Sequence, residues 1–237
     1  MRGFEIRLLI AVLRSVIMEI IMKKFPIKNC SRSSFIIFVF SVLVVAGSFA
    51  LGTGEEELDS SSGYDVVVVG ATPGGIMASI AAGRMGSSVL LLERSGHIGG
   101  LPANGLGATD IATRGATGGL FREFVQRIRQ HYEHTYGKES PQVKDCSDGY
   151  RFEPRVAALV FQDMLNEADD KINVLIMRQF DCNPSRVIKE NGRITAVQVV
   201  NRRTGSLETY RGQVFIDATY EGDLAAAAGA PYRLGRE

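Results

Sequence analysis

The stretch that decides the fold is DVVVVGATPGGIMASIAAGRMGSSVLLLE, residues 65–93. Its beginning, residues 66–69, is a continuous β-branched run, which is typical of a parallel strand buried on both faces. A glycine-rich turn, an alanine-rich helix and a second apolar run at residues 89–92 follow. The order strand, turn, helix, strand predicts the first βαβ unit of an α/β protein with a parallel sheet.

The turn inside this unit has the composition of an anion site. Thr72 suits the N-cap of a helix and Pro73 its first position. The free N–H groups and the positive dipole end of such a helix suit a pyrophosphate. Gly70 allows the tight turn, Gly75 allows close packing of the helix on the strand, and Glu93 follows Gly70 by 23 residues, where an acid can accept hydrogen bonds from ribose hydroxyls.

Thr72 departs from the usual pattern of this turn. The usual pattern is G-x-G-x-x-G, and Thr72 occupies the position of the second glycine. A β-branched residue there either limits the approach of the backbone to a phosphate or offers its own hydroxyl as a donor. The residues of this unit by themselves fit an FAD site and an NAD site equally well.

The remaining chain predicts the completion of the sheet. Residues 94–110 hold five glycines and are expected to form a loop that comes close to an extended ligand. Amphipathic helices are expected at residues 118–136 and 152–170, with a polar loop between them at residues 138–149. A strand is expected at residues 172–177, a hairpin at residues 186–200 and a returning strand at residues 214–219. Asn191-Gly192 is the hairpin turn signal.

The N-terminus has the pattern of an export signal. Residues 33–54 carry no charge, and basic residues precede them. Residues 1–50 are therefore expected to be a cleaved signal peptide, with a membrane anchor through residues 35–51 as the competing interpretation. Residues 1–21 lie before Met22, a more usual start, and residues 51–64 are expected to be a linker. Both interpretations place the remainder of the chain outside the cytoplasm: it is periplasmic or extracellular if the signal is cleaved, and anchored to the membrane if it is not.

Charge and cysteine content exclude some classes of function. Residues 1–50 hold seven Lys or Arg and two Asp or Glu, a net charge of +5, and the remainder holds 20 and 24, a net charge of −4. A mildly acidic body argues against a nucleic-acid partner. The three cysteines follow no C-x-x-C spacing, and no metal site is expected.

The motifs together resemble a known family. DVVVVGATPGGI, LLLERSGHIGG, GLGATD, FEP and FIDATYEGDLAAAAGA make residues 64–237 similar to the FAD-dependent oxidoreductases of the glutathione-reductase-like Rossmann type, in particular to an exported branch labelled xanthan-lyase-like. The resemblance implies a Rossmann-like parallel sheet with a β-ribbon insertion and FAD as the cofactor. It implies an oxidoreductase in which an unidentified small-molecule substrate passes a hydride to flavin N5, with an unidentified electron acceptor.

The resemblance also implies the cofactor-binding residues by position. The pyrophosphate turn corresponds to Gly70, Thr72, Pro73, Gly74 and Gly75, and the ribose acid to Glu93, with Arg94 beside it near the adenosine. The loop along the phosphate and ribityl portion corresponds to Gly99 and Gly100, and the position whose backbone meets the adenine to Phe180, just after the strand that begins at Ile172. The last signature corresponds to Ala218 and Thr219, followed by Asp223. Tyr220 stands where the A-T-G signature has glycine. No catalytic residue is indicated.

The resemblance further implies that residues 65–237 are an incomplete FAD-binding domain. Family members continue past Glu237 with a substrate domain and a C-terminal FAD segment. Two alternatives stay open at this point: an NAD-dependent dehydrogenase of similar fold, and an inactive truncated flavoprotein fragment.

Overall fold

The computed structural model describes residues 63–168 and 170–236. The expected signal peptide or anchor and most of the expected linker lie outside these residues. Within them, no helix is long and apolar enough to cross a membrane. The strands are β1 (Tyr64–Val69), β2 (Val89–Leu92), β3 (Ile172–Leu175), β4 (Arg178–Gln179), β5 (Val187–Glu190), β6 (Arg193–Asn201) and β7 (Leu207–Asp217). The helices are α3 (Pro73–Arg84), α4 (Gly100–Ala103), α5 (Gly119–Tyr136), α6 (Pro141–Asp145), α7 (Pro154–Ala168) and α8 (Asp223–Ala227), with short 3₁₀ turns η1 (Arg114–Ala116), η2 (Ser147–Gly149) and η3 (Pro184–Arg186).

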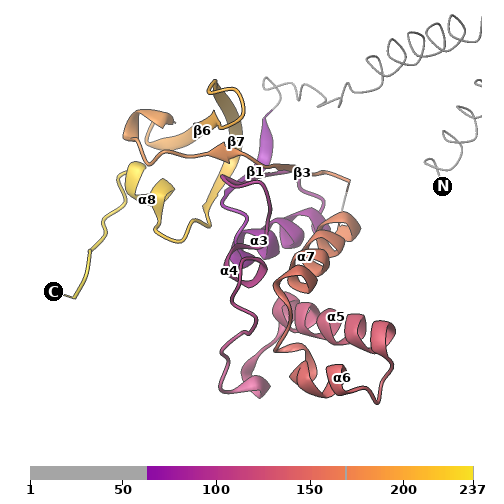
Figure 1. Ribbon diagram of the computed structural model, residues 1–237. Coiled ribbons are helices and arrows are strands. Elements are labelled where there is room, and N and C mark those ends of the chain that lie inside the picture. Colours follow the sequence, from indigo (N-terminus) through magenta and orange to yellow (C-terminus); the bar gives the residue numbers. More distant parts are fainter. Residues whose placement is uncertain (1–62, 169, 237) are drawn as a thin grey trace, which may run out of the picture. The chain divides into compact units, whose positions relative to one another are not determined.

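The strands form one mixed sheet in the order β3-β2-β1-β7-β6-β4, with β5 paired to β6. The β1, β2, β3 and β7 strands run parallel, and β4, β5 and β6 form an antiparallel ribbon that continues from β7 (Figure 1). The 11 residues of β7 serve both parts: its first half pairs with β6, and the half from Gly212 pairs with β1. This is the predicted Rossmann-like sheet with its β-ribbon insertion.

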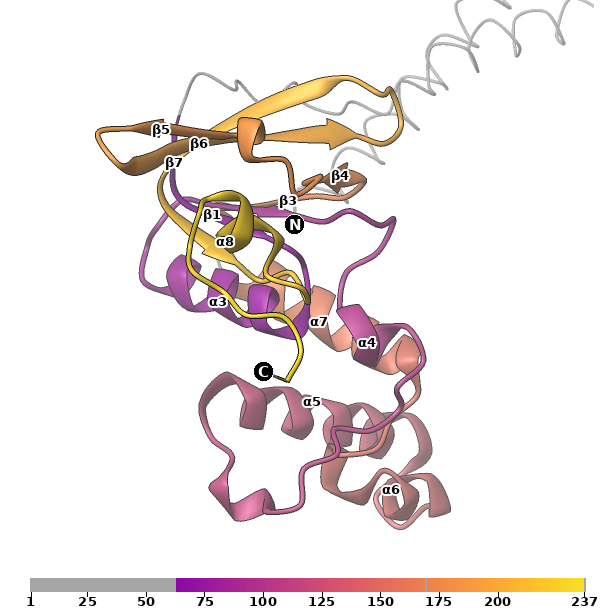
Figure 2. The same ribbon diagram turned by 90° about the vertical axis from the view of Figure 1, so that its left-hand side faces the viewer.

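The valine run of β1 faces two cores at once. Val66 and Val68 belong to the hydrophobic cluster under α3, α5 and α7, whereas Val67 and Val69 belong to the cluster between the parallel part of the sheet and the ribbon. Successive side chains of a strand point to opposite faces, so a strand buried on both faces needs an unbroken apolar run. Figure 2 shows α3 and α7 on one side of the sheet and the ribbon on the other.

Two local predictions have different outcomes. The hairpin at Asn191-Gly192 is confirmed, and both residues have the positive φ angles, 51° and 78°, that such a two-residue turn needs. The polar loop expected at residues 138–149 is wrong, because it contains α6 and η2. Ser140 begins α6 by accepting a hydrogen bond from the Val143 N–H, with Pro141 in the first turn.

A chain of charges ties the helices together. Glu123 on α5 accepts two hydrogen bonds of 2.8 Å from Arg84 on α3. Arg127, one turn further along α5, donates to Glu123 at 3.1 Å and to Glu167 on α7 at 2.7 Å. The hydrogen bonds from Arg84 and then Arg127, which outweigh partial burial, lower the pKa of Glu123 from 4.5 to about 2.

Glu123 therefore gives a pH-dependent stability prediction. A carboxyl whose pKa is lower in the folded state stabilises the fold above its unfolded pKa and loses this effect as the pH falls through the folded pKa. We expect Glu123→Gln to lower the free energy of unfolding at pH 7 by about 1 kcal/mol. The difference from wild type should shrink between pH 4.5 and about 2. Urea unfolding at several pH values measures it, and a difference that does not change with pH contradicts the prediction.

Candidate functional site

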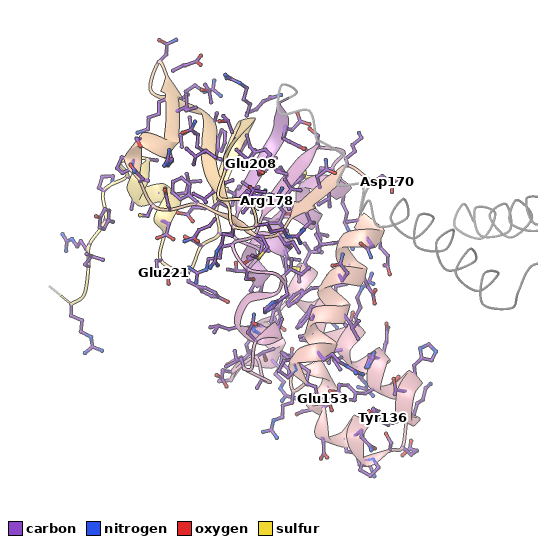
Figure 3. The ribbon with its side chains drawn as sticks, turned by 45° about the horizontal axis from the view of Figure 1, so that its top comes forward. Tyr136, Glu153, Asp170, Arg178, Glu208 and Glu221 are labelled. Carbon is purple, nitrogen blue, oxygen red and sulfur yellow. The ribbon has the colours of Figure 1, made fainter. Side chains whose placement is uncertain are left out.

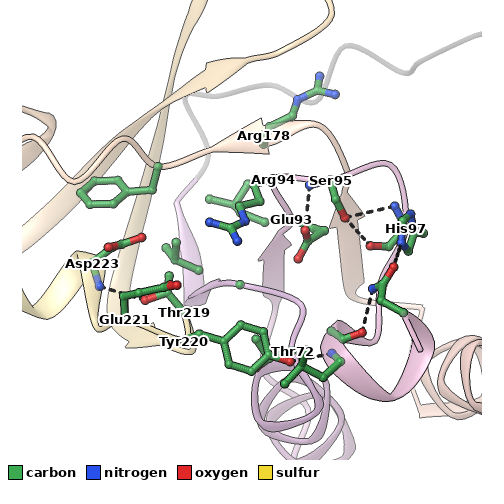
Figure 4. Close-up of a pocket in the computed structure, with 17 residues that line it drawn as sticks. Thr72, Glu93, Arg94, Ser95, His97, Arg178, Thr219, Tyr220, Glu221 and Asp223 are labelled. Carbon is green, nitrogen blue, oxygen red and sulfur yellow. Dashed lines mark hydrogen bonds between the residues drawn. The ribbon is translucent and has the colours of Figure 1, made fainter. Parts of the chain in front are cut away.

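A pocket of about 630 Å³ opens at the carboxyl ends of β1, β2 and β7. The chain leaves β1 in one direction to reach β2, and β7 returns on the other side of β1, so the pocket lies at the switch point of the parallel sheet, where ligands of such folds bind. Its walls, drawn in Figure 4, are formed by Val69, Gly70, Thr72, Leu92, Glu93, Arg94, Ser95, His97, Gly100, Leu101, Asn104, Arg178, Phe180, Thr219, Tyr220, Glu221 and Asp223.

Three backbone segments meet at the base of the pocket with no room for side chains. Gly70 has a φ of 102°, and a Cβ there would lie 2.6 Å from the Ala218 carbonyl oxygen. A Cβ on Gly75 would lie 2.0 Å from the Gly70 carbonyl oxygen and 2.9 Å from the Ala218 Cβ. These contacts bring the start of α3 directly against the ends of β1 and β7. The N-terminus of a 12-residue helix is thus held beside the pocket.

Thr72 uses its hydroxyl within the protein. The oxygen accepts a hydrogen bond from the Gly75 N–H at 3.3 Å, as predicted for an N-cap, and donates to the Ala218 carbonyl at 2.9 Å. Of the two alternatives that the sequence left open for this residue, donation of its hydroxyl to a phosphate does not fit, because the hydroxyl proton is already engaged. Thr72 instead fastens the turn to the end of β7.

Glu93 is held at the pocket by two backbone donors. One carboxylate oxygen accepts from the Ala71 N–H at 2.9 Å and the other from the Ser95 N–H at 2.7 Å. Each carboxylate oxygen has a second lone pair. The carboxylate is therefore fixed in position and still has acceptor capacity toward the pocket, which is what a pair of ribose hydroxyls requires.

The turn after β7 is organised by Asp217, which sequence reasoning did not single out. One of its carboxylate oxygens accepts from both the N–H and the hydroxyl of Thr219, at 3.0 and 2.7 Å. The other accepts from the Ala225 N–H at 2.7 Å. The Thr219 hydroxyl in turn accepts from the Asp223 N–H at 2.9 Å. Its position at the end of an apolar strand, before Ala-Thr, was the available signal.

The predicted site residues divide into two groups. Those on the pocket wall are Gly70, Thr72, Glu93, Arg94, Gly100, Phe180, Thr219 and Asp223. Those that do not line the pocket are Pro73, Gly74, Gly75, Gly99 and Ala218. The resemblance predicted Gly99 along the cofactor; Gly99 is buried, and a Cβ there would lie 2.6 Å from the Ala103 Cβ and 3.0 Å from the Phe161 ring. Packing of α4 on α7 accounts for that glycine.

Arg178 is a pocket residue that sequence reasoning missed. It contributes to the wall from β4 and makes a paired contact with Glu208 on β7, at 2.9 and 3.3 Å (Figure 3). Tyr210 and Asn201 also donate to Glu208, each at 2.7 Å. Burial raises the pKa of the Glu208 carboxyl, but these hydrogen bonds outweigh it and hold the pKa below its ordinary value. The ion pair therefore fixes the ribbon side of the pocket.

The arrangement defines a class of protein, the dinucleotide-binding α/β proteins. It combines a helix N-terminus packed on a parallel sheet without intervening side chains, an acid at the end of the neighbouring strand and a returning strand that closes the site. Among the described residues, no cluster of His, Cys, Asp or Glu is suited to a metal ion.

Comparison with known proteins identifies the family. Residues 65–237 match the model of the family described as FAD dependent oxidoreductase, and the chain belongs to it. FAD is the cofactor of this family. The residues present fit FAD, because the start of α3 is packed closely on the ends of β1 and β7 beside the pocket, and Glu93 keeps free acceptor capacity.

Several relatives agree with this family. The chain is 29% identical over 160 residues to the soluble pyridine nucleotide transhydrogenase of Shigella boydii serotype 18, a match that covers 65% of this chain and 30% of the relative. It is 27% identical over 180 residues to the digeranylgeranylglycerophospholipid reductase 2 of Methanopyrus kandleri, covering 73% and 39%. The chain thus spans less than half the length of these curated relatives.

Among solved structures, the glycerol-3-phosphate dehydrogenase from Bacillus halodurans complexed with FAD is similar, with a TM-score of 0.49 and 12% identity, over 72% of this chain and 37% of that one.

Proposed function

We propose that this domain binds the adenosine and pyrophosphate end of FAD in an enzyme that oxidises an organic substrate. When bound, the cofactor would accept a hydride from the substrate at N5, and a second acceptor would then reoxidise it. The observation that carries the proposal is the Glu93 carboxylate, fixed by the Ala71 and Ser95 N–H groups at the wall of a pocket that also contains the turn before α3.

The chain's own contribution is binding and orientation. Glu93 would hold the ribose, the start of α3 would hold the pyrophosphate, and Phe180, directly after β4, would lie against the adenine. His97 also lines the pocket, but it is exposed and hydrogen bonded to Asn104, which is itself held by the Gly100 carbonyl at 2.7 Å. We assign it no catalytic role.

The relatives support a redox role without naming a substrate for this chain. One is named as a transhydrogenase and one as a lipid reductase, and this chain covers 30% and 39% of them. Two relatives whose names describe such different reactions resemble this chain in one cofactor-binding region. This is what we expect if the domain supplies the cofactor and other segments select the substrate.

The colour of the purified protein tests the proposal. We expect the full chain to bind FAD and to absorb at roughly 450 nm, as flavins do. Titration of the flavin-free protein with FAD, followed by flavin fluorescence, gives the affinity, and titration with NAD is the matched comparison. A colourless protein that binds NAD and not FAD overturns the proposal. A protein that binds FAD but oxidises none of a panel of alcohols, amines and thiols limits it to a binding fragment.

We further propose that the protein is exported. The proposal is supported by the uncharged residues 33–54, which follow basic residues and precede an acidic run. Expression of the full chain in a bacterial host, with cell fractionation and mass determination, tests it. A mature protein beginning near residue 51 outside the cytoplasm is expected. An intact chain in the membrane fraction indicates an anchor through residues 35–51, and an intact chain in the cytoplasm contradicts export.

A further inference from the structure

Tyr220 crosses from one wall of the pocket to the other. It lies in the turn between β7 and α8, and its hydroxyl accepts a hydrogen bond of 2.7 Å from the N–H of Leu101 on α4, 119 residues earlier in the chain. Figure 4 shows the ring beside Thr72 and the start of α3. The residue that replaces the glycine of the A-T-G signature is therefore part of the same pocket as the pyrophosphate turn.

The position of the phenol is fixed by its neighbours. A Cβ on Gly100 would lie 2.2 Å from the Tyr220 hydroxyl oxygen and 3.1 Å from Pro73 Cδ, so the absence of a side chain at Gly100 makes room for the phenol. Pro73 is the first residue of α3. The hydroxyl thus lies next to the first turn of α3, the helix whose N-terminus suits an anion.

The hydroxyl proton of Tyr220 has no acceptor among the described residues. The oxygen accepts from Leu101, and a phenol can at the same time donate one hydrogen bond. Tyr220 is 53% exposed and lines the pocket, so its hydroxyl is free to donate to a ligand there. The hydroxyl of Thr72, in the turn before α3, is already donated to the Ala218 carbonyl. Tyr220 therefore supplies the free hydroxyl donor that Thr72 does not.

We infer that Tyr220 is a cofactor-binding residue whose hydroxyl donates a hydrogen bond to the pyrophosphate of FAD. The inference rests on the proposed binding of the pyrophosphate at the start of α3. The phenol would take over a contact that a glycine at this position leaves to the backbone. The Tyr220 ring would not need to repack to reach a phosphate oxygen, because the hydrogen bond from the Leu101 N–H already holds the ring across the pocket.

Binding measurements on the full-length, flavin-free protein test this inference. We expect Tyr220→Phe to weaken the binding of FAD and of ADP by roughly tenfold or more, because a hydrogen bond to a charged group is lost. The affinity for adenosine should stay within about twofold of wild type. Tyr136→Phe, which removes an exposed hydroxyl outside the pocket, is the matched control and should leave all three ligands unchanged. Circular dichroism melts confirm that both variants fold.

A spectroscopic readout separates direct contact from a loosened α4. The ³¹P resonances of bound FAD should shift between wild type and Tyr220→Phe, since a donor to the phosphate is removed. Unchanged affinity for FAD and ADP, tighter binding by the variant, or equal losses for ADP and adenosine each overturn the inference while the proposed function stands. If wild type binds neither FAD nor ADP, the proposed function and the inference both fall.

Discussion

Gly75→Ala is expected to destabilise the domain by about 3 kcal/mol and to weaken FAD binding more than tenfold, the upper range for an overpacked site. The new Cβ would lie 2.0 Å from the Gly70 carbonyl oxygen, which is backbone and cannot rotate away. The start of α3 must therefore move off β1. Because the proposed pyrophosphate site consists of that helix start, the same movement would remove the ligand contacts.

Gly74→Ala is the matched control for this prediction. It adds the same methyl group to the next position in the same helix turn, where the nearest atom is the Thr72 hydroxyl oxygen at 3.8 Å. Its free energy of unfolding should stay within about 0.5 kcal/mol of wild type. Urea unfolding of both variants, with FAD titration of Gly75→Ala, gives the comparison. Equal stability of the two variants would show that α3 is not packed as tightly on β1 as described.

The sequence predicted best those parts of the fold that depend on neighbours in the chain. The valine run of residues 66–69 predicted a strand buried on both faces, and Thr72-Pro73 predicted the start of α3, because both signals act within one turn or strand. The α6 helix was missed, although Ser140-Pro141 is the same signal, because the polar residues around it indicated a loop.

The pocket walls were harder to predict, because they are set by contacts between distant residues. Tyr220 finds its partner on α4, 119 residues away, and Arg178 is fixed by Glu208 across the ribbon. The packing at Gly99 was hard to predict for the same reason, since the Phe161 ring against it comes from α7. A glycine in a loop next to a ligand site looks the same in sequence whether a ligand or a side chain requires it.

Glu93→Gln is expected to weaken the binding of FAD and of ADP by roughly 10- to 100-fold, the range for lost hydrogen bonds to a charged acceptor. The carboxylate accepts from the Ala71 and Ser95 N–H groups with different oxygens. A glutamine amide has one oxygen and one NH₂ group, so one of these N–H donors would face another donor. We also expect a loss of about 1–2 kcal/mol in stability, since the turn after β1 and the loop after β2 share this anchor.

The stability loss and the ribose contact can be separated with a second ligand. Wild type should bind ADP more tightly than 2′-deoxy-ADP, because only ADP offers the full hydroxyl pair to Glu93. In Glu93→Gln the difference between the two nucleotides should largely disappear, whereas a variant weakened only by a distorted turn would lose affinity for both in parallel and keep their ratio. An affinity ratio equal to that of wild type would therefore show that Glu93 does not bind the ribose. The proposed function would then lose the observation on which it depends most.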